Sequence, residues 1–353
     1  MKVYDLPTPA LLVYESVLKK NAKAMQALAD GSGLKLRPHF KSHKCASLAH
    51  MQIEYGAKGM TCAKLSEAED LADAGINDIL IANQIVEPEK IERVARLAAK
   101  CRITVLADCE ENLLMLARAA RFCGSDIGIY IEYEIGMQRC GVSDKAEALR
   151  LARLINSEKG LTLRGIQAYA GHLSHEADAK KREEATLKNH KRIRELVSYL
   201  EENGVKIDEI SGASTGTAAI KAREGLYTEL QAGSYLFMDA TYSELGLEFE
   251  NSLFILTTVV SVSENLAVVD CGIKTCGVDQ GMPKPKDFEC DFIVDSEEHL
   301  QIHSPKAELK VGDKILLVPA HCCSTINLHE KIYLVDGDEM INRISVSGRG
   351  YGR

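Results

Sequence analysis

Histidine and lysine side chains gather in one short stretch that could bind an anion or provide a nucleophile. Residues 37–44 read Arg-Pro-His-Phe-Lys-Ser-His-Lys, so Lys41 has His39, His43 and Lys44 as close neighbours in the chain. A lysine amine that is partly buried among positive charges becomes a better nucleophile, as Schiff-base formation requires. The alternative is that this cluster is an anion-binding patch on a surface loop, and from spacing alone we favour that alternative.

A second pair of reactive side chains lies far along the chain. His321 and Cys323 offer an imidazole and a thiolate two residues apart. On an extended segment such residues face the same way, so the two could share one metal ion while Cys322 points elsewhere, although a single His-x-Cys pair is a weak signal by itself. A structural zinc site needs four protein ligands, whereas two would leave positions open for substrate and water. Thiolate plus imidazole favours zinc, with manganese or magnesium as alternatives.

Glycine and hydroxyl residues form two segments suited to a phosphate group. These are Gly212–Thr217, which contains Ser214, Thr215 and Gly216, and the pair Gly233-Ser234. Small residues let backbone N–H groups approach a phosphate, and hydroxyls add donors. The alternative is that Ser214 or Thr215 caps the next helix. The two interpretations are compatible, because a helix N-terminus is itself an anion site.

The elements that must position these residues follow an alternating pattern from about residue 15 to 245. Helical patterns cover 16–30, 66–74, 87–100, 110–123, 145–158 and 177–203. Apolar runs predict strands near 34–41, 58–63, 78–83, 102–108, 126–134, 162–170, 208–214 and 228–237. Eight strands that alternate with helices predict a (β/α)8 barrel of the TIM type. An open doubly wound sheet would need a glycine-rich turn after its first strand, where this chain has His39–Lys44.

Active sites in such barrels lie at the carboxyl ends of the strands. Lys41 ends the first predicted strand, and the two glycine–hydroxyl segments follow the seventh and eighth, which is the common phosphate position. A lysine at a strand end, across the barrel from a phosphate site, suggests a Schiff base with a cofactor.

After residue 248 the helical patterns give way to short strands joined by turns. Strands are predicted at 253–262, 266–271, 291–295, 300–303, 314–319 and 331–335, and residues 11–14 could supply one more. We therefore predict two domains: a barrel over 15–245, and a β-rich domain made of 1–14 and 246–353 that carries His321 and Cys323.

Composition narrows the class of protein. The formal net charge is −8 and no Lys/Arg run occurs, so nucleic acid and anionic membranes are poor partners. No stretch of eighteen apolar residues and no signal-peptide pattern is found. The 11 scattered cysteines favour reduced thiols and a cytoplasmic location.

Several ordered motifs together resemble one known family, the D-threonine aldolases and D-serine dehydratases. These are fold-type III, alanine racemase-like enzymes that use pyridoxal 5'-phosphate (PLP). The motifs that carry the resemblance are Thr8–Leu11, Arg37–Lys44, Ser66–Glu69, Gly136–Gly141, Glu229–Tyr235 and Pro319–Thr325. They run nearly from end to end of the chain.

The resemblance implies a role for each candidate residue. It makes Lys41 the lysine that carries PLP as a Schiff base, and it makes His321 and Cys323 the ligands of a divalent metal. It implies that Tyr169 lies against the pyridine ring, that Arg139 lies near the phenolic oxygen, and that His172 transfers a proton. A hydrogen-bonded structural histidine is the alternative for His172. The implied phosphate-binding residues are Ser214, Thr215, Gly216, Gly233, Ser234 and Tyr235.

The implied function is a metal-dependent lyase acting on β-hydroxy D-amino acids, in a homodimer. Cys323 resembles the dehydratases, whereas residues 233–240 resemble the 3-hydroxy-D-aspartate aldolases. We favour the D-serine dehydratase type, because a metal ligand takes part in the reaction more directly than residues 233–240 do. The alternative is retro-aldol cleavage of D-threonine or 3-hydroxy-D-aspartate to glycine and an aldehyde. An amino-acid racemase and a non-catalytic PLP-binding protein rank lower.

Overall fold

The computed structural model describes residues 1–351, which form two compact units. The barrel unit contains Met25–Lys41 and Leu48–Gly233, together with Tyr351. The sheet unit contains Met1–Ala24, Ser42–Ser47 and Ser234–Gly350. Each unit has its own sheet and its own hydrophobic core.

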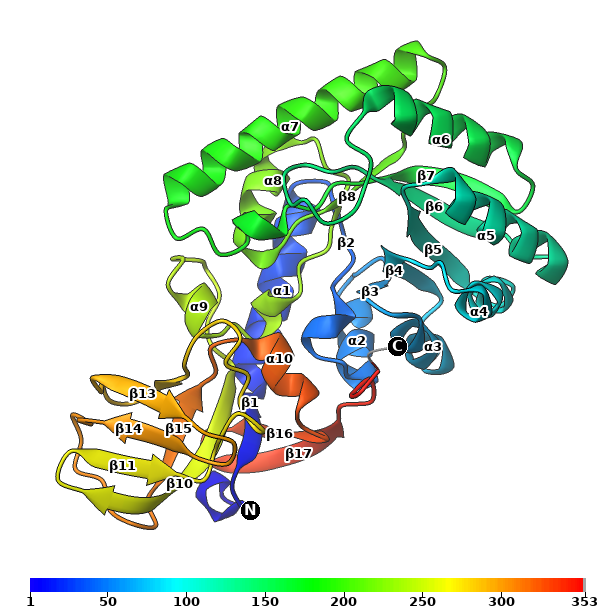
Figure 1. The fold of residues 1–353 in the computed structure, drawn as a ribbon. Helices are drawn as coiled ribbons and strands as arrows, with labels where there is room; N and C mark the ends of the chain where they lie inside the picture. The colour runs from blue at the N-terminus through cyan, green and yellow to red at the C-terminus, as the bar shows by residue number, and fades with distance from the viewer. Residues whose placement is uncertain (352–353) are drawn as a thin grey trace. The chain divides into compact units, whose positions relative to one another are not determined.

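Eight parallel strands form the sheet of the barrel unit within the described residues, as predicted (Figure 1). Their order around the sheet is β2-β9-β8-β7-β6-β5-β4-β3. The barrel closes where His39, just after β2, pairs with Thr61 of β3, and the Thr61 N–H donates to the Pro38 carbonyl at 2.8 Å. The strands are β2 (Lys35–Leu36), β3 (Met60–Cys62), β4 (Asp78–Gln84), β5 (Arg102–Ala107), β6 (Ile127–Glu132), β7 (Leu161–Gln167), β8 (Glu209–Gly212) and β9 (Glu229–Leu230).

Helices accompany these strands, and Figure 1 shows α3 to α6 on the outer side of the sheet. Two of them begin or end at residues typical of helix termini: Pro88 lies in the first turn of α4, and Gly124 ends α5 in a left-handed conformation. The helices are α1 (Glu15–Gly31), α2 (Ala46–Glu54), α3 (Leu65–Asp73), α4 (Pro88–Ala98), α5 (Glu110–Cys123), α6 (Lys145–Ser157), α7 (Ala179–Glu202) and α8 (Ala218–Glu224).

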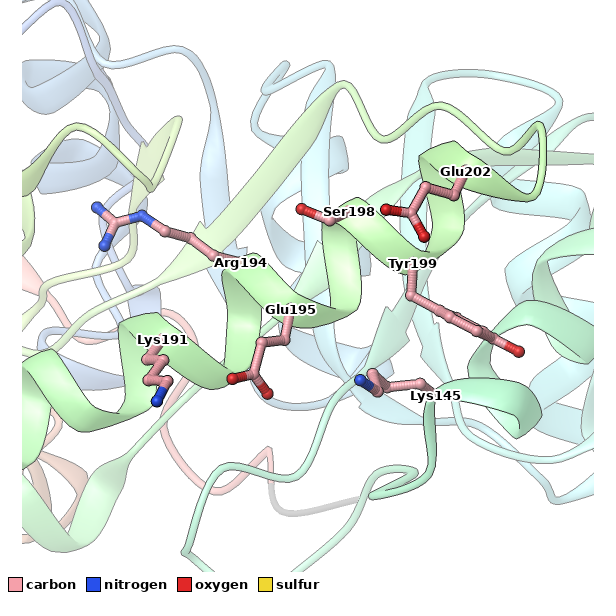
Figure 2. A pocket seen from close by; sticks show the side chains of 7 residues that line it. All are labelled: Lys145, Lys191, Arg194, Glu195, Ser198, Tyr199 and Glu202. Carbon is pink, nitrogen blue, oxygen red and sulfur yellow. The ribbon is translucent and has the colours of Figure 1, made fainter.

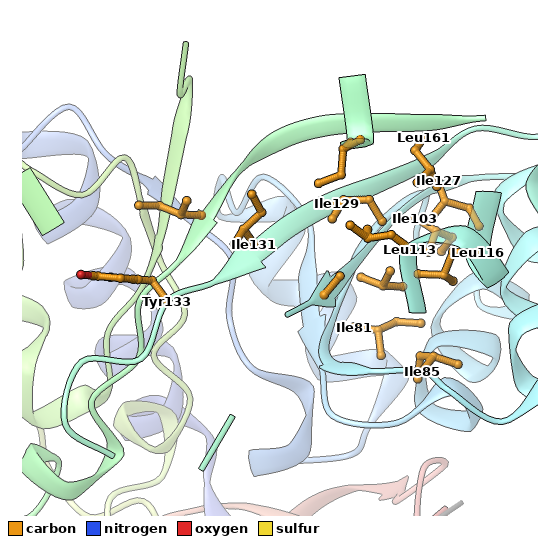
Figure 3. Packing of buried hydrophobic residues seen from close by; sticks show 14 of the residues in the cluster. Ile81, Ile85, Ile103, Leu113, Leu116, Ile127, Ile129, Ile131, Tyr133 and Leu161 are labelled. Atoms are coloured by element: carbon orange, nitrogen blue, oxygen red, sulfur yellow. The ribbon is translucent and has the colours of Figure 1, made fainter. Parts of the chain in front are cut away.

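The period of two along each strand separates two packing layers. Ile81, Ile103 and Ile129 belong to the main core cluster together with Leu113 and Leu116 of α5 (Figure 3). The neighbouring residues Leu80, Leu106 and Tyr130 form a separate buried cluster. The strands are therefore covered on both faces, which explains their continuous apolar runs.

The sheet unit is built on nine strands within the described residues, and most pairs are antiparallel. Strand β1 lies inside this sheet, antiparallel to β10 and parallel to β16, so the prediction of an added N-terminal strand is confirmed. The strands are β1 (Ala10–Tyr14), β10 (Leu253–Ser263), β11 (Leu266–Val269), β12 (Lys284–Pro285), β13 (Phe292–Asp295), β14 (Leu300–His303), β15 (Lys314–Val318), β16 (Lys331–Asp336) and β17 (Glu339–Ser345). Two short helices are added, α9 (Ala240–Ser243) and α10 (Cys322–Asn327).

Among the helices of residues 1–351, none is long and apolar enough to cross a membrane.

Candidate active site

Lys41 lies in a short 3₁₀ turn, η2 (Phe40–Ser42), just after β2 in the barrel unit. The predicted strand runs to Lys41, but β2 ends at Leu36. The chain between them is held at His39, whose N–H donates to the Ala232 carbonyl at 3.2 Å and whose Nδ1 accepts from the Lys41 N–H at 3.4 Å. Lys41 is therefore fixed at the carboxyl end of the first barrel strand, and its side chain is half-buried.

Three polar residues that the sequence analysis missed end the next strands of the barrel. The Gln84 amide, at the end of β4, donates to Glu132 at 2.5 Å and to Asp108 at 3.3 Å. Asp108 follows β5 and accepts from the Gly141 N–H at 2.9 Å. Glu132 ends β6 and lies 3.1 Å from the Arg139 guanidinium. This network anchors the loop 136–141 at the carboxyl ends of the strands.

The loops after β6 and β7 bring the predicted residues Arg139, Tyr169 and His172 together. The Arg139 guanidinium lies 5.6 Å from the centre of the Tyr169 ring, which is a cation–π distance. The His172 ring packs on Gly136, where an added Cβ would meet its Cε1 at 3.2 Å. His172 itself is exposed, so its ring is available to a proton donor or acceptor in solution.

The segment after β8 has the geometry of both a helix cap and an anion site. Ser214 begins a 3₁₀ turn, η4 (Thr215–Thr217), and its N–H donates to the Thr217 hydroxyl at 3.1 Å. The helix α8 continues from this turn, so the first N–H groups have no acceptor one turn earlier in the helix. Ala213 adopts a left-handed φ of 82°, a conformation that is uncommon outside glycine and concentrates at functional sites.

The turn after β9 lies beside this segment, because the Gln231 N–H donates to the Gly212 carbonyl at 2.7 Å. Gly233 ends this turn. Apart from Gln231, the residues of both loops are small or hydroxylated, and all are buried, as a backbone cradle for a phosphate requires.

In the sheet unit, Ser234 lies near Cys323. The Ser234 hydroxyl is 3.8 Å from the Cys323 thiol, and the next residue, Tyr235, is completely buried. Ser234 opens another 3₁₀ turn, η5 (Ser234–Leu236). Ser234, a predicted phosphate-binding residue, therefore lies close to Cys323, a predicted metal ligand.

The prediction that His321 and Cys323 lie on one extended segment is wrong. His321 is extended, with φ −140° and ψ 115°, but it caps α10, and Cys323 lies in the first turn of that helix. The two side chains nevertheless meet, because the chain turns sharply after His321. Burial lowers the pKa of His321, but hydrogen bonds with Cys323 and Asp279 outweigh it and raise this pKa to about 9.

The Cys322 thiol is completely buried, and its backbone N–H donates to Asp239 at 3.0 Å. Across residues 1–351, no group of three or more His, Cys, Asp and Glu side chains forms a metal-binding cluster. A metal ion at His321 and Cys323 would therefore have two protein ligands of the soft N/S type.

A surface hollow of about 460 Å³ lies on α7 beside the start of α6 and contains none of the predicted site residues (Figure 2). Its lining mixes positive and negative groups, including Lys145, Lys191, Arg194 and Glu195. It does not contribute to the candidate site.

Comparison with known proteins shows the family to which this chain belongs. The family model described as "Alanine racemase, N-terminal domain" matches residues 14–241, and the model "Putative serine dehydratase domain" matches residues 252–335. The chain is 36% identical to the 3-hydroxy-D-aspartate aldolase of Paracoccus denitrificans (strain Pd 1222), over 99% of this chain and 93% of that protein. It is also 36% identical to a D-threonine aldolase of Arthrobacter sp, over 98% of this chain and 93% of that protein.

The structure of the chain also matches solved structures of this family. The crystal structure of D-threonine aldolase from Filomicrobium marinum superposes with a TM-score of 0.97 at 34% identity, covering 100% of this chain and 98% of that one. The D-serine dehydratase of Dictyostelium discoideum is more distant, with 24% identity over 96% of each chain.

Proposed function

Because this chain belongs to the alanine racemase-like, PLP-dependent lyases that include D-threonine aldolases and D-serine dehydratases, we propose that it is an aldolase for β-hydroxy D-amino acids. The reaction breaks the Cα–Cβ bond and yields glycine and an aldehyde, or glyoxylate when the substrate is 3-hydroxy-D-aspartate. The observation that carries this proposal is the near full-length similarity to two aldolases at 36% identity. It reverses the preference for dehydration that Cys323 suggested.

The described residues fit PLP. Lys41 would hold it covalently, and the two small-residue loops would bind its phosphate through Ser214, Thr215, Gly216, Gly233, Ser234 and Tyr235. Tyr169 would face the pyridine ring, and Arg139, held by Glu132 at 3.1 Å, would face the phenolic oxygen. When bound, PLP supplies an electron sink for the substrate's Cα.

The donor set of His321 and Cys323 fits a divalent metal, and we propose zinc, with manganese and magnesium as alternatives. When bound, such a metal lowers the pKa of a hydroxyl group that it coordinates. His172 would accept the proton that leaves the substrate's β-hydroxyl as the Cα–Cβ bond breaks. Lys41 would return a proton to Cα of the glycine product.

Dehydration is the second candidate, and one specific observation favours it. A cysteine stands at the second metal-ligand position, where the family's aldolases tend to have aspartate. The same residues would serve the reaction differently: Lys41 would remove the proton from Cα and hydroxide would leave from Cβ.

We also expect a homodimer, which sedimentation of the purified protein would test.

Product analysis tests the choice between the two reactions. The PLP-loaded protein is incubated with D-threonine, 3-hydroxy-D-aspartate and D-serine, each with zinc, with manganese and with a strong chelator. Glycine together with acetaldehyde or glyoxylate supports the aldolase, and L-threonine serves as the stereochemical control. Pyruvate and ammonia from D-serine as the main products would replace the proposal by the dehydratase.

A further inference from the structure

The imidazole of His321 is held from behind by a carboxylate. Asp279 lies in the segment between β11 and β12, and its Oδ2 is 2.7 Å from His321 Nδ1. Its other oxygen, Oδ1, accepts a hydrogen bond from the Ser324 hydroxyl. With Nδ1 facing a carboxylate, Nε2 is the ring nitrogen that remains to bind a metal on the side of Cys323.

The loop that carries Asp279 is fastened to the start of α10 by a second contact. The Gly277 N–H donates to the Thr325 hydroxyl at 3.1 Å, and that hydroxyl donates to the His321 carbonyl at 2.8 Å. The loop and the backbone of His321 are therefore connected through one side chain. This contact fixes the distance between Asp279 and the imidazole independently of their own hydrogen bond.

Gly277 permits this close approach because it lacks a side chain. A Cβ at this position would lie 2.1 Å from Ser324 Oγ and 2.7 Å from Ser324 Cβ. Both distances are shorter than atoms tolerate, so the loop or Ser324 would have to move. Position 277 therefore needs glycine because there is no room for a side chain, and not because its backbone conformation is unusual.

We propose that Asp279 is a positioning residue for the metal centre: it orients His321, fixes its tautomer and strengthens Nε2 as a ligand. This inference rests on the proposed role of His321 and Cys323 as metal ligands. Carboxylates behind a ligating histidine act in this way in many metal sites, and their loss weakens metal binding by about 10–100-fold. Asp279 does not touch the substrate in this role; it acts through His321. Ser324 and Gly277 support it in turn.

Metal affinity measured on the full-length, PLP-loaded protein tests the proposal. Zinc is titrated in competition with a chromophoric chelator for wild type, Asp279→Ala, Asp279→Asn and His321→Ala. We expect zinc to bind about 10–100-fold more weakly to Asp279→Ala. Asp279→Asn should lose less, because its amide oxygen still accepts the Nδ1 proton. The control is Asp295→Asn, which removes the same charge from an exposed site on β13 and should bind zinc like wild type.

The melting temperature without metal separates positioning from folding. Asp279→Ala should melt like wild type without zinc and gain less from added zinc. Gly277→Ala should reproduce the weaker binding, because it displaces the same loop. If Asp279→Ala binds zinc as tightly as wild type while His321→Ala does not, the inference is overturned and the proposed metal site stands. If wild type binds no zinc, manganese or magnesium, the metal part of the proposed function fails.

Discussion

The Ser234 hydroxyl lies 3.8 Å from the Cys323 thiol, although 89 positions of the chain separate the two residues. Ser234 belongs to the proposed phosphate-binding set, and Cys323 is a proposed metal ligand. Their contact lies within the sheet unit. In this unit, a proposed phosphate-binding residue and a proposed metal ligand would therefore lie next to each other.

The first prediction concerns Ser234. Replacing it by alanine removes one donor from a charged phosphate, a loss that typically amounts to about 1.5 kcal/mol or roughly tenfold in affinity. We expect Ser234→Ala to bind PLP about tenfold more weakly, with a smaller effect on zinc, because a thiol is a weak hydrogen-bond partner. Fluorescence titration of the PLP-free protein measures both. Ser243→Ala, at an exposed hydroxyl of α9, is the matched control; equal PLP affinity in both variants would remove Ser234 from the phosphate set.

Much of the fold could be predicted, because periodic apolar runs determine which segments are buried. All eight barrel strands occur where the runs are, and α5 and β14 have the predicted bounds. All of them except β4 end earlier than predicted, and β4 extends one residue further, to Gln84. The segment 228–237 contains only two strand residues because the chain turns at Gly233 and Ser234. Strand β17 was missed because its side chains are mostly exposed and carry no apolar alternation.

The candidate site was less predictable, because its residues meet only after folding. Lys41, His321 and Cys323 stand in recognisable motifs, whereas Gln84, Asp108 and Glu132 are single polar residues at the carboxyl ends of three separate strands. The one signal for them is their shared place at strand ends. Asp279 is 42 positions from His321 and has no motif of its own. The helix at Cys322 was not predicted because it is short and begins only four residues after the apolar strand β15 ends at Val318.

The second prediction concerns Lys41. Lys41→Ala should lose the visible absorbance of lysine-linked PLP, because no other amine is proposed to bind the cofactor covalently. Its activity should fall by about 10²–10⁴-fold, the usual loss when a positioned proton-transfer group is removed. Absorbance spectra and product formation measure the two effects. Lys44→Ala, which removes the nearby lysine and leaves Lys41 in place, is the comparison variant. A spectrum of Lys41→Ala that matches wild type would show that another residue carries PLP.

The third prediction concerns the choice of metal. Cys323→Asp replaces a soft thiolate by a hard carboxylate, so zinc should lose about tenfold or more relative to manganese and magnesium. We also expect more glycine and less pyruvate among the products, as the aldolases of this family tend to have aspartate there. Metal titrations and product ratios are the measurements, with Cys290→Ser as the control for thiol loss. Unchanged zinc preference in Cys323→Asp would argue against Cys323 as a ligand.

The fourth prediction concerns a buried ion pair in the barrel unit. The Arg37 guanidinium, 2% exposed, lies 2.9 Å from Glu229 and 2.8 Å from Asp78. Breaking such a pair leaves a buried charge with less compensation, at a cost of about 3–5 kcal/mol. Glu229→Gln should therefore lower the free energy of unfolding in urea by roughly 3 kcal/mol, the lower end of that range. Glu297→Gln removes an exposed carboxylate beside Lys274 and should change stability little. Similar unfolding midpoints for the two variants would contradict the prediction that the buried ion pair contributes more to stability than the exposed one.

The last prediction concerns Lys221, a completely buried lysine of α8. Its amine donates to the Tyr227 hydroxyl at 2.9 Å, which donates to the Ala168 carbonyl at 2.8 Å, and the buried His190 ring packs on Tyr227. Burial lowers the pKa of Lys221 to about 7, far below its usual value. Between these two values the unfolded chain binds a proton that the folded chain does not, so stability rises with pH.

Each pH unit above 7 should therefore add up to about 1.4 kcal/mol to the free energy of unfolding, until the unfolded lysine also loses its proton. In Lys221→Met this contribution disappears, and the slope of stability against pH between 7 and about 9 should fall by that amount. Urea unfolding at several pH values measures both slopes. Lys191→Met, at an exposed lysine that lines the α7 hollow, is the control and should keep the slope of wild type. Parallel curves for wild type and Lys221→Met would mean that Lys221 stays protonated in the folded barrel.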